Sequence, residues 1–544
     1  MDSFSGRIVD VENQRIFGGT ITIREAKIDS VVEDPTIDGG PIYSPGLVDA
    51  HVHIESSLLS PSAFASAAVV HGTVATVSDP HEIANVCGIE GVDWMIRSAA
   101  ETPVQISFGA PSCVPATPFE TAGAHFGAKE IGSLLDKPEV SYLAEVMNFP
   151  AVIAQDPDLM AIIKEASKRC LPIDGHAPGV TGKDLLAYAS AGIETDHECV
   201  TLEEAKDRIS VGMKVAIREG SAARNFDALW PIIKDEPDSC FFCSDDKHPD
   251  DLIVSHVDGL VRRAVRNGID PITAIQVASL NPARHYGLGV GLLRPGDSAD
   301  FIEVEELEDF RPKRTWIKGE LVAEDGLSLL SPSQLPPVNR FEVSPLSLDS
   351  IRMPLVPGKS FATIVAEDGQ LITGSDSVIP TAKEGLVVSD PSRDLLKIVV
   401  VNRYGNTPPA VGLIRNFGLK TGAIAGSVAH DSHNIVAVGA DDHVLVKAIN
   451  AIITCKGGLS FASRETLACL PLPVAGLISE KEAPEAAREF THLTSLAKED
   501  GCRLGSPYMT LSFMSLLVIP SLKIGDRGHF DVNSFTLIDP WQSK

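Results

Sequence analysis

Hydrophobic and polar positions follow different patterns in successive parts of the chain. Over residues 5–45 they alternate through GRIVDV and GTITIREAKIDSVV, with glycine-rich turns between, as a half-buried antiparallel sheet requires. From 46 to about 290, short apolar runs alternate with stretches of helical length. Between 291 and 340 short strand patterns return, in ADFIEVEEL and RTWIKGELVAED. The pattern predicts an α/β region flanked on both sides by β segments.

The central region, residues 46–290, contains eight apolar runs, and each run ends in polar or charged residues. Eight strands separated by helices are typical of a parallel (β/α)₈ barrel rather than an open sheet. The β segments at 1–45 and 291–340 form either separate small units or one composite β-sandwich. The eight runs are GLVDAHV, VATVSD, QISFGA, SYLAEVM, LPIDGHA, IETDHE, KVAIRE and CFFCSDD.

A proline- and serine-rich stretch at 332–350 (PSQLPPVNRFEVSPLSLDS) has the composition of a linker. The remaining part of the chain, residues 341–544, has strand patterns of its own in LKIVVVNRYG and HNIVAVGA. A helical pattern follows near 476–499. We therefore expect an additional C-terminal α+β domain.

Composition narrows the classes of function. The 544 residues are 44% hydrophobic and 22% charged, an ordinary globular balance, and the formal charge is 46 − 73 = −27. A field this negative repels phosphate backbones and anionic lipids, so we expect no nucleic-acid or membrane partner. The longest apolar stretch, 511–522, is too short to span a bilayer. Nine scattered cysteines and the lack of a signal-peptide pattern predict a cytoplasmic protein.

Side chains of the metal-ligand type stand at the ends of five of the eight runs. His51 and His53 alternate on one strand, so both imidazoles point to the same side. In a barrel these strand ends converge on one mouth. Four imidazoles and two carboxylates could hold two Zn, Mn or Fe(II) ions with a bridging hydroxide. The predicted ligands are His51, His53, Glu145, His176, His197 and Asp245.

A second group of candidates follows the second strand. Asp79, His81 and Glu82 end the run VATVSD and begin the next helical stretch. They could bind substrate or relay protons, with His81 and Glu82 as catalytic groups and Asp79 as a substrate ligand. The alternative role is orientation of a ligand histidine.

A third group follows the seventh strand. Arg218, Glu219 and Ser221 offer both donors and acceptors, which the edge of a purine ring needs. The alternative is a buried ion pair that holds the loop. Asp246, next to Asp245, is expected to cap the following helix.

The C-terminal region contains His430 and His433, three residues apart in HDSH. They could bind metal, close over the barrel mouth as a lid, or belong to an ordinary turn; we expect a lid. Structural roles are expected for five further histidines, which are His71, His125, His248, His256 and His285.

One tempting motif fails. Cys240-x-x-Cys243 and His53-x-Glu55 resemble the signature of zinc nucleoside deaminases. However, Ser239 stands where proline is required, and the two halves lie 240 − 53 = 187 residues apart. The chain also lacks a P-loop, a dinucleotide fingerprint and a G-x-S-x-G elbow.

Longer motifs carry a resemblance to a known family. PGLVDAHVH, at 45–53, resembles the first-strand signature of the amidohydrolase superfamily, and the two flanking β segments resemble its composite sandwich. Further segments along the whole chain are similar to adenine deaminases of the bacterial and archaeal type. They are HVHIESS (51–57), DPHEI (79–83), SCVP (112–115), LAEVM (143–147), DGHAP (174–178), REGSAARN (218–225), CSDD (243–246) and SVAHDSHN (427–434).

This resemblance implies hydrolysis of adenine to hypoxanthine and ammonia in purine salvage, on a binuclear centre of Mn or Fe(II), with Zn as a further candidate. It implies that His51, His53 and Asp245 bind the first ion, that His176 and His197 bind the second, and that Glu145 bridges them. Glu145 replaces the carbamylated lysine of dihydroorotase-like enzymes. We expect Asp245 to shuttle the proton of the hydroxide.

The resemblance also implies a homo-oligomer, such as a dimer, with adenine and water as substrates. Three alternatives remain open from the residues. One is another cyclic amide or amidine hydrolase on the same barrel, and the second is a catalytically inactive scaffold. The third is a C-terminal domain that binds a regulatory partner. The six intact candidate ligands disfavour the scaffold.

Overall fold

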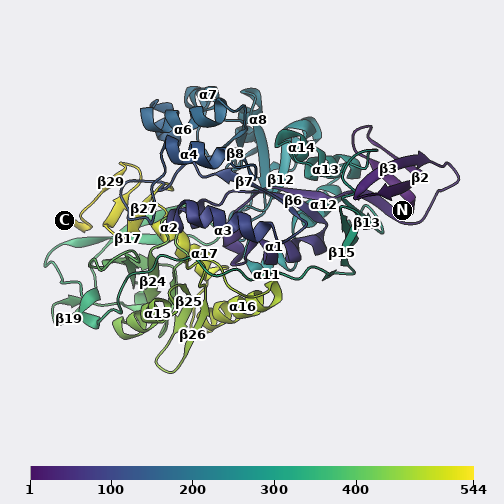
Figure 1. The fold of residues 1–544 in the computed structure, drawn as a ribbon. Helices are drawn as coiled ribbons and strands as arrows, with labels where there is room; N and C mark the ends of the chain where they lie inside the picture. Colours follow the sequence, from purple (N-terminus) through teal and green to yellow (C-terminus); the bar gives the residue numbers. More distant parts are fainter. Residues whose placement is uncertain (1, 544) are drawn as a thin grey trace.

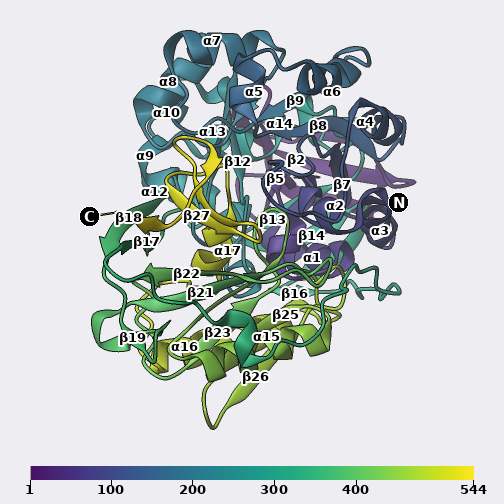
Figure 2. The ribbon, with the colours of Figure 1, turned by 90° about the vertical axis from the view of Figure 1, so that its left-hand side faces the viewer.

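The computed structural model of the protein describes residues 2–543. Three parts are visible in Figure 1. A barrel lies at the centre, a small sheet carrying the N-terminus lies at one end, and a C-terminal domain packs beneath the barrel. Figure 2 shows the C-terminal domain along one side of the barrel, with the segment around β27 extending up beside it.

The barrel contains eight parallel strands, one for each predicted run. They pair as a five-stranded and a three-stranded sheet. A parallel bridge between Val52 and Asp245 joins the first strand to the segment after the eighth. On the other side, the Glu194 amide donates to the Ile173 carbonyl at 2.9 Å. The predicted barrel is therefore confirmed. Its strands are β5 (Leu47–Val52), β6 (Thr73–Ser78), β7 (Gln105–Ala110), β8 (Val140–Val146), β9 (Ile173–Gly175), β10 (Thr195–Asp196), β11 (Lys214–Arg218) and β12 (Cys240–Cys243).

Helices cover the outside of the barrel. Capping residues and prolines in the local sequence mark where several of them begin. In α8, Thr201 accepts from the Glu204 amide while the Glu204 carboxylate accepts from the Thr201 amide. In α13, Asp270 caps the helix and Pro271 occupies its first position. The helices of this region are α1 (Pro61–Ala68), α2 (His81–Cys87), α3 (Ile89–Ala99), α4 (Ala128–Leu135), α5 (Phe149–Ile153), α6 (Pro157–Ser167), α7 (Gly182–Ser190), α8 (Leu202–Ser210), α9 (Phe226–Leu229), α10 (Ile232–Asp235), α11 (Pro249–Leu252), α12 (Val257–Arg266), α13 (Pro271–Ala278) and α14 (Leu280–His285).

The two flanks of the barrel share one eight-stranded sheet, ordered β16-β15-β14-β13-β4-β1-β2-β3. Strand β4 joins them, because it pairs with β1 from the first flank and with β13 from the second. The rings of Phe301 and Trp316 stack at 4.7 Å in its core. The composite of both flanks is confirmed. Its strands are β1 (Asp2–Asp10), β2 (Arg15–Arg24), β3 (Lys27–Glu33), β4 (Ile42–Pro45), β13 (Phe301–Val304), β14 (Pro312–Ile317), β15 (Glu320–Glu324) and β16 (Leu327–Ser328).

The C-terminal domain is built on a sheet ordered β18-β17-β22-β21-β24-β23-β25-β26, with β30 beside β17. Helix α16 packs against α11 and α1 of the barrel. An α+β domain is confirmed, whereas the boundaries after 45, 290 and 340 stay a prediction. The elements are β17 (Ser360–Ala366), β18 (Thr373–Val378), β19 (Ala382–Lys383), β20 (Leu386–Val387), β21 (Leu396–Val401), β22 (Ala410–Arg415), β23 (Ala423–Gly426), β24 (Ile435–Gly439), α15 (Asp442–Cys455), β25 (Gly458–Ala462), β26 (Leu467–Pro471), α16 (Ala483–Glu499), α17 (Pro507–Ser512), β27 (Leu522–Gly525), β28 (Gly528–Asp531), β29 (Thr536–Leu537) and β30 (Trp541–Gln542).

The apolar stretch 511–522 is mostly buried. Across residues 2–543, no helix combines the length and the apolar character that a membrane crossing needs. Contacts with the barrel loops fix the domain in place. The Thr121 amide donates to Asp526 at 2.9 Å, and Arg527 donates to the Pro118 carbonyl at 2.8 Å.

Lys523 in β27 gives this region a testable pH dependence. Its ammonium is fully buried and donates to the Leu371 and Phe513 carbonyls at 2.8 and 3.0 Å. Burial lowers its pKa to about 7. The unfolded chain then binds this proton more tightly, because an exposed lysine has a pKa near 10.4. The buried lysine therefore destabilises the folded state by its full amount below about pH 7. This destabilisation disappears as the pH rises toward the pKa of an exposed lysine.

We therefore expect the Lys523→Met variant to lack the part of the pH dependence of the free energy of unfolding that arises from this lysine. Between about pH 7 and pH 10 the free energy of unfolding of wild type should rise relative to that of the variant, by at most about 1.4 kcal/mol per pH unit. Denaturant unfolding of both proteins measures this difference. Lys498→Met, at an exposed position of α16, is the matched control. A wild-type-minus-variant difference that does not change with pH would contradict the prediction.

Candidate active site

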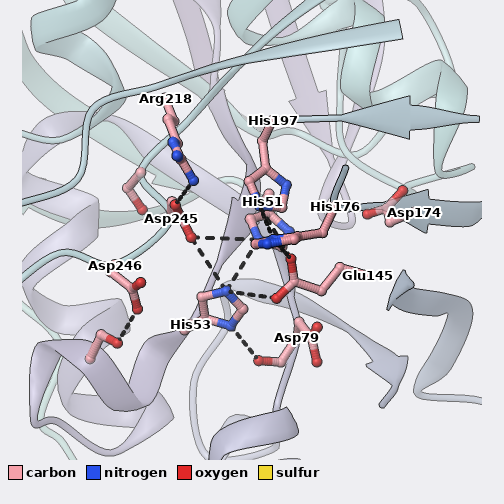
Figure 3. A network of polar contacts seen from close by, with 12 residues as sticks. His51, His53, Asp79, Glu145, Asp174, His176, His197, Arg218, Asp245 and Asp246 are labelled. Atoms are coloured by element: carbon pink, nitrogen blue, oxygen red, sulfur yellow. Dashed lines mark hydrogen bonds and ion pairs between the residues drawn. The ribbon is translucent and has the colours of Figure 1, made fainter. Parts of the chain in front are cut away.

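The six predicted ligands meet at the mouth of the barrel (Figure 3). All of them are buried, with His176 the most exposed at 9%. His51 lies near the end of β5 and His53 directly follows that strand, while Glu145 lies near the end of β8. The other three directly follow or lie just beyond strands β9, β10 and β12, and they are His176, His197 and Asp245.

One half of the cluster contains two imidazoles and Asp245. The Nε2 atoms of His51 and His53 are 3.2 Å apart. Asp245 Oδ1 lies 3.3 Å from His53 Nε2 and 3.7 Å from His51 Nε2. These three side chains therefore point at one common position.

The other half is arranged in the same way around Glu145. Its Oε2 lies 2.9 Å from His176 Nδ1 and 3.2 Å from His197 Nε2, and these two nitrogens are 3.3 Å apart. Its other oxygen, Oε1, lies 3.6 Å from His53 Nε2. Glu145 thus faces both halves of the cluster, with a different oxygen toward each.

The protonation of His53 can be read from its partners. Its Nδ1 lies 3.1 Å from the carbonyl oxygen of Asp79, which can only accept, so Nδ1 carries the proton. In the neutral ring, Nε2 then presents a lone pair to Asp245 and Glu145. Acceptors that face one another in a buried space repel unless a cation lies among them. Nitrogen and carboxylate donors at this spacing fit divalent metal ions.

The local electrostatics also favour positive charge. Burial opposes protonation of His53, but the hydrogen bond to Asp245 and the surrounding carboxylates outweigh it and raise its pKa well above the usual value. Burial would raise the pKa of Glu145, yet His176 and His197 hold it well below its usual range. The site as a whole is built to hold cations among ionised carboxylates.

Backbone contacts bring Asp245 to the first strand. Its amide donates to the His51 carbonyl at 2.9 Å, and its carbonyl accepts from the His53 amide at 3.3 Å. Its φ of +56° lies in the left-handed region, which an aspartate adopts only at some cost. The seam between the first and eighth strands therefore fixes where this carboxylate points.

Arg218 holds Asp245 from behind. Its Nη1 donates to Asp245 Oδ2 at 2.7 Å, and its guanidinium forms a two-point pair with Glu198, with Nη2 to Oε2 at 2.9 Å. Burial would raise the pKa of Asp245, but Arg218 keeps it well below the usual range. Glu198 was not among the sequence candidates. The available signal was its position directly after His197 in the strand-end run IETDHE.

Two other predicted substrate contacts lie apart from the cluster. Glu219 pairs with Arg263 at 2.7 Å. Ser221 donates to Asp251 at 2.5 Å and accepts from the His248 amide at 2.9 Å. Neither Glu219 nor Ser221 lines the cleft beside the ligand cluster.

The expectation that Asp246 caps a helix is wrong. Helix α11 starts at Pro249, and its N-cap residue is His248. Asp246 instead accepts from the Ser56 hydroxyl at 2.5 Å and lines the cleft. The loop after β12 is longer than the capping interpretation assumed, so this carboxylate stays at the barrel mouth.

The candidates after the second strand lie beside the cluster. Asp79 Oδ2 is 3.1 Å from His81 Nδ1, which in turn lies 3.5 Å from Glu145 Oε1. His81 Nε2 is 3.3 Å from Glu82 Oε1. These contacts form a chain that leads from the ligand cluster to Glu82.

The C-terminal domain reaches the same place. His430 Nδ1 lies 2.6 Å from Glu82 Oε1, and His433 contacts the other oxygen of Glu82. Asp431 Oδ1 lies 3.8 Å from His81 Nε2. Burial would raise the pKa of Glu82, but the two histidines of the C-terminal domain and His81 lower it well below its usual range. The two histidines thus lie over the barrel mouth, and their role as a lid stays a prediction.

Two cavities with shared lining residues lie at the cluster and next to it. The inner cleft, of about 30 Å³, lies among the predicted ligands, Glu82, His430 and Asp431. An outer cavity of about 650 Å³ lies between barrel loops and the C-terminal domain. The residues that line both are Met147, Glu198, Arg218, Leu371 and Val518. The outer cavity therefore lies directly beside the cleft that holds the cluster.

Comparisons with known proteins agree over the whole chain. The amidohydrolase family model matches residues 42–322, and the model of the adenine deaminase C-terminal domain matches residues 370–536. The adenine deaminase of Salinibacter ruber is 49% identical over 99% of this chain and 98% of its own length. That of Methanosarcina mazei is 49% identical over 99% of each.

Among solved structures, N-acetyl-D-glucosamine-6-phosphate deacetylase from Mycobacterium smegmatis is 15% identical. It matches with a TM-score of 0.46 and covers 59% of this chain and 100% of its own. The resemblance that the sequence motifs carry is confirmed by the family models and the curated relatives. The chain belongs to the adenine deaminase family, and its barrel is an amidohydrolase domain.

Proposed function

We propose that this protein catalyses the hydrolytic deamination of adenine to hypoxanthine and ammonia, as a step of purine salvage. Family membership over the whole chain is the observation that carries this proposal. The buried cluster at the barrel mouth supports it, because replacement of an aromatic amine by water needs an activated water and a nearby proton donor.

The cluster is proposed as a binuclear metal site. His51, His53 and Asp245 would hold one ion, and Glu145 would bridge to the other. Bound divalent ions lower the pKa of water and polarise the atom that it attacks. Mn and Fe(II) are the ions proposed first, with Zn as a further candidate. The second ion would be held by His176 and His197, whose facing nitrogens support the assignment.

The carboxylates near the cluster have distinct proposed tasks. Asp245 stays ionised because Arg218 pairs with it, so it can accept a proton at the cleft. Glu82 lines the cleft and, as an ionised carboxylate, is proposed to relay a proton at the purine ring, while His81 lies between Glu82 and Glu145. Asp79 orients His81 through its contact with Nδ1.

Substrate binding is proposed to involve Arg218, since it lines both cavities. Glu219 and Ser221 contact other loop residues, so we propose that they hold the loop after β11 rather than touch the purine. The protein is further proposed to act as a homodimer in the cytoplasm. The nine cysteines, all free thiols here, support a reducing compartment.

A panel of substrates tests the reaction. The purified protein is loaded with Mn, Fe(II) or Zn and given adenine, adenosine or dihydroorotate. We expect ammonia release from adenine and no turnover of dihydroorotate. Turnover of dihydroorotate without deamination of adenine would contradict the proposal and favour another cyclic amide hydrolase.

The first variant prediction concerns Asp245. Asp245→Asn keeps the size of the side chain but removes the proton acceptor, so turnover should fall by about 10²- to 10⁴-fold. Steady-state kinetics with metal analysis measures this. Asp227→Asn, whose side chain is 89% exposed, is the control. Retention of most of the activity by Asp245→Asn would exclude the proton-shuttle role.

The second variant prediction concerns Glu145. Glu145→Gln removes the charge that faces both halves of the cluster, so the metal content should fall from two ions per chain toward one or none. Elemental analysis after dialysis measures the content. Glu139→Gln, at an exposed position before the same strand, should keep two ions. An unchanged two-ion content in Glu145→Gln would contradict the bridging role.

A further inference from the structure

Glu82 is held by side chains from the other domain. It lies in the first turn of α2 at the barrel mouth and is 2% exposed. Its two oxygens face His430 and His433, which belong to the loop between β23 and β24 of the C-terminal domain. The contact between Glu82 and His433 joins residues that are 351 positions apart in the sequence.

The hydrogen-bond pattern fixes the proton on His433. The Ala429 amide donates to His433 Nδ1 at 3.2 Å, so this nitrogen is an acceptor and carries no proton. In the neutral ring the proton is therefore on Nε2, which donates it to Glu82 Oε2. The same arrangement excludes Nε2 of the neutral ring as a metal ligand, because its lone pair is not available.

His430 is fixed by packing and by a second contact. Its ring stacks on Phe513 with centroids 4.6 Å apart, and its backbone amide donates to the Ser512 carbonyl at 3.1 Å. Its Nδ1 lies 2.6 Å from Glu82 Oε1. A carboxylate cannot donate in its ionised form, so His430 is the donor in this contact.

Backbone contacts restrict the conformation of the loop that carries the two histidines. His433 has a φ of +52°, in the left-handed region. Arg403, a buried arginine, donates to the His433 carbonyl at 3.3 Å, and Tyr404 donates to the Ser432 carbonyl at 2.6 Å. Loop atoms that are tied in this way place the two imidazoles with little freedom.

We propose that His430 and His433 are positioning residues that clamp the Glu82 carboxylate at the cleft, so that the C-terminal domain completes the active site. This inference rests on the proposed function, because it assigns Glu82 a task in that reaction. The two histidines do not touch the substrate in this account. They hold both oxygens of Glu82, and thereby set where the carboxyl group meets the purine ring.

Paired substitutions separate hydrogen bonding from packing. His433→Gln keeps an N–H donor near the position of Nε2, and His430→Asn keeps one near the position of Nδ1. His433→Leu and His430→Leu keep bulk and lose the donor. The full-length metal-loaded enzyme is used for all four variants, with His492→Leu on the exposed face of α16 as the control.

The clamp predicts a fall in kcat of about 10- to 100-fold for each leucine variant, the usual range when an orienting partner is lost. KM and metal content should stay close to wild type, and the amide variants should recover most of kcat. In a Glu82→Gln background, His433→Leu should cause no further loss, because the partner is already altered. Equal losses in both backgrounds, amide variants as impaired as the leucine variants, or a fall in metal content would each overturn the clamp.

A spectroscopic readout keeps the clamp testable if the substrate assignment fails. Wild-type enzyme that does not deaminate adenine would refute the proposed function, and the clamp is then judged from ¹⁵N-histidine NMR of the zinc-loaded protein. We expect one Nε2–H signal that is absent in His433→Gln and shifts in Glu82→Gln. A His433 signal that is unchanged by Glu82→Gln would overturn the clamp whatever the substrate is.

Discussion

The structure depends on how the repulsion between closely spaced hydrogen-bond acceptors at the barrel mouth is relieved. Five strands of the barrel direct four imidazoles and two carboxylates into one buried space, where facing nitrogen and oxygen atoms lie 2.9 to 3.7 Å apart. Unprotonated acceptors at such distances repel one another, and the repulsion is strong where water is excluded. Divalent cations convert this repulsion into coordination, so formation of the barrel mouth and binding of metal should be coupled.

The residues around the cluster hold its side chains in place. The Asp245 backbone bonds to both neighbours of Val52, which fixes the seam between the first and eighth strands. Behind the seam, the Ser244 amide and His256 Nε2 both donate to Asp49, at 2.9 and 2.8 Å. Arg218 then neutralises part of the negative charge at the mouth. These buried charges thus have partners, as the low dielectric of a protein interior requires.

The sequence predicts the barrel well because its signals are local. Each apolar run is a strand, and the spacing of His51 and His53 places both rings on one side. The contacts that the sequence did not predict link distant segments. Pairing of Arg218 with Glu198 rather than Glu219 depends on how two loops pack, and Asp246 points to the mouth because of the path of its loop. Strand periodicity carries no information about such loop geometry.

The contact between Glu82 and His433 is also one that sequence patterns cannot predict, because it joins two domains. A histidine pair in a C-terminal segment has many ordinary explanations, and only the packed structure brings it to the second strand of the barrel. The family resemblance predicted that this segment matters, but it did not say what the segment touches. The cleft at the barrel mouth is therefore lined by residues of both the barrel and the C-terminal domain.

The most direct test of the whole account is titration of the metal-free enzyme with Mn while the rate of adenine deamination is followed. The account predicts no activity without metal and a rate that rises until two ions are bound per chain. Full activity with one ion per chain, or no release of ammonia from adenine at any metal loading, would contradict it.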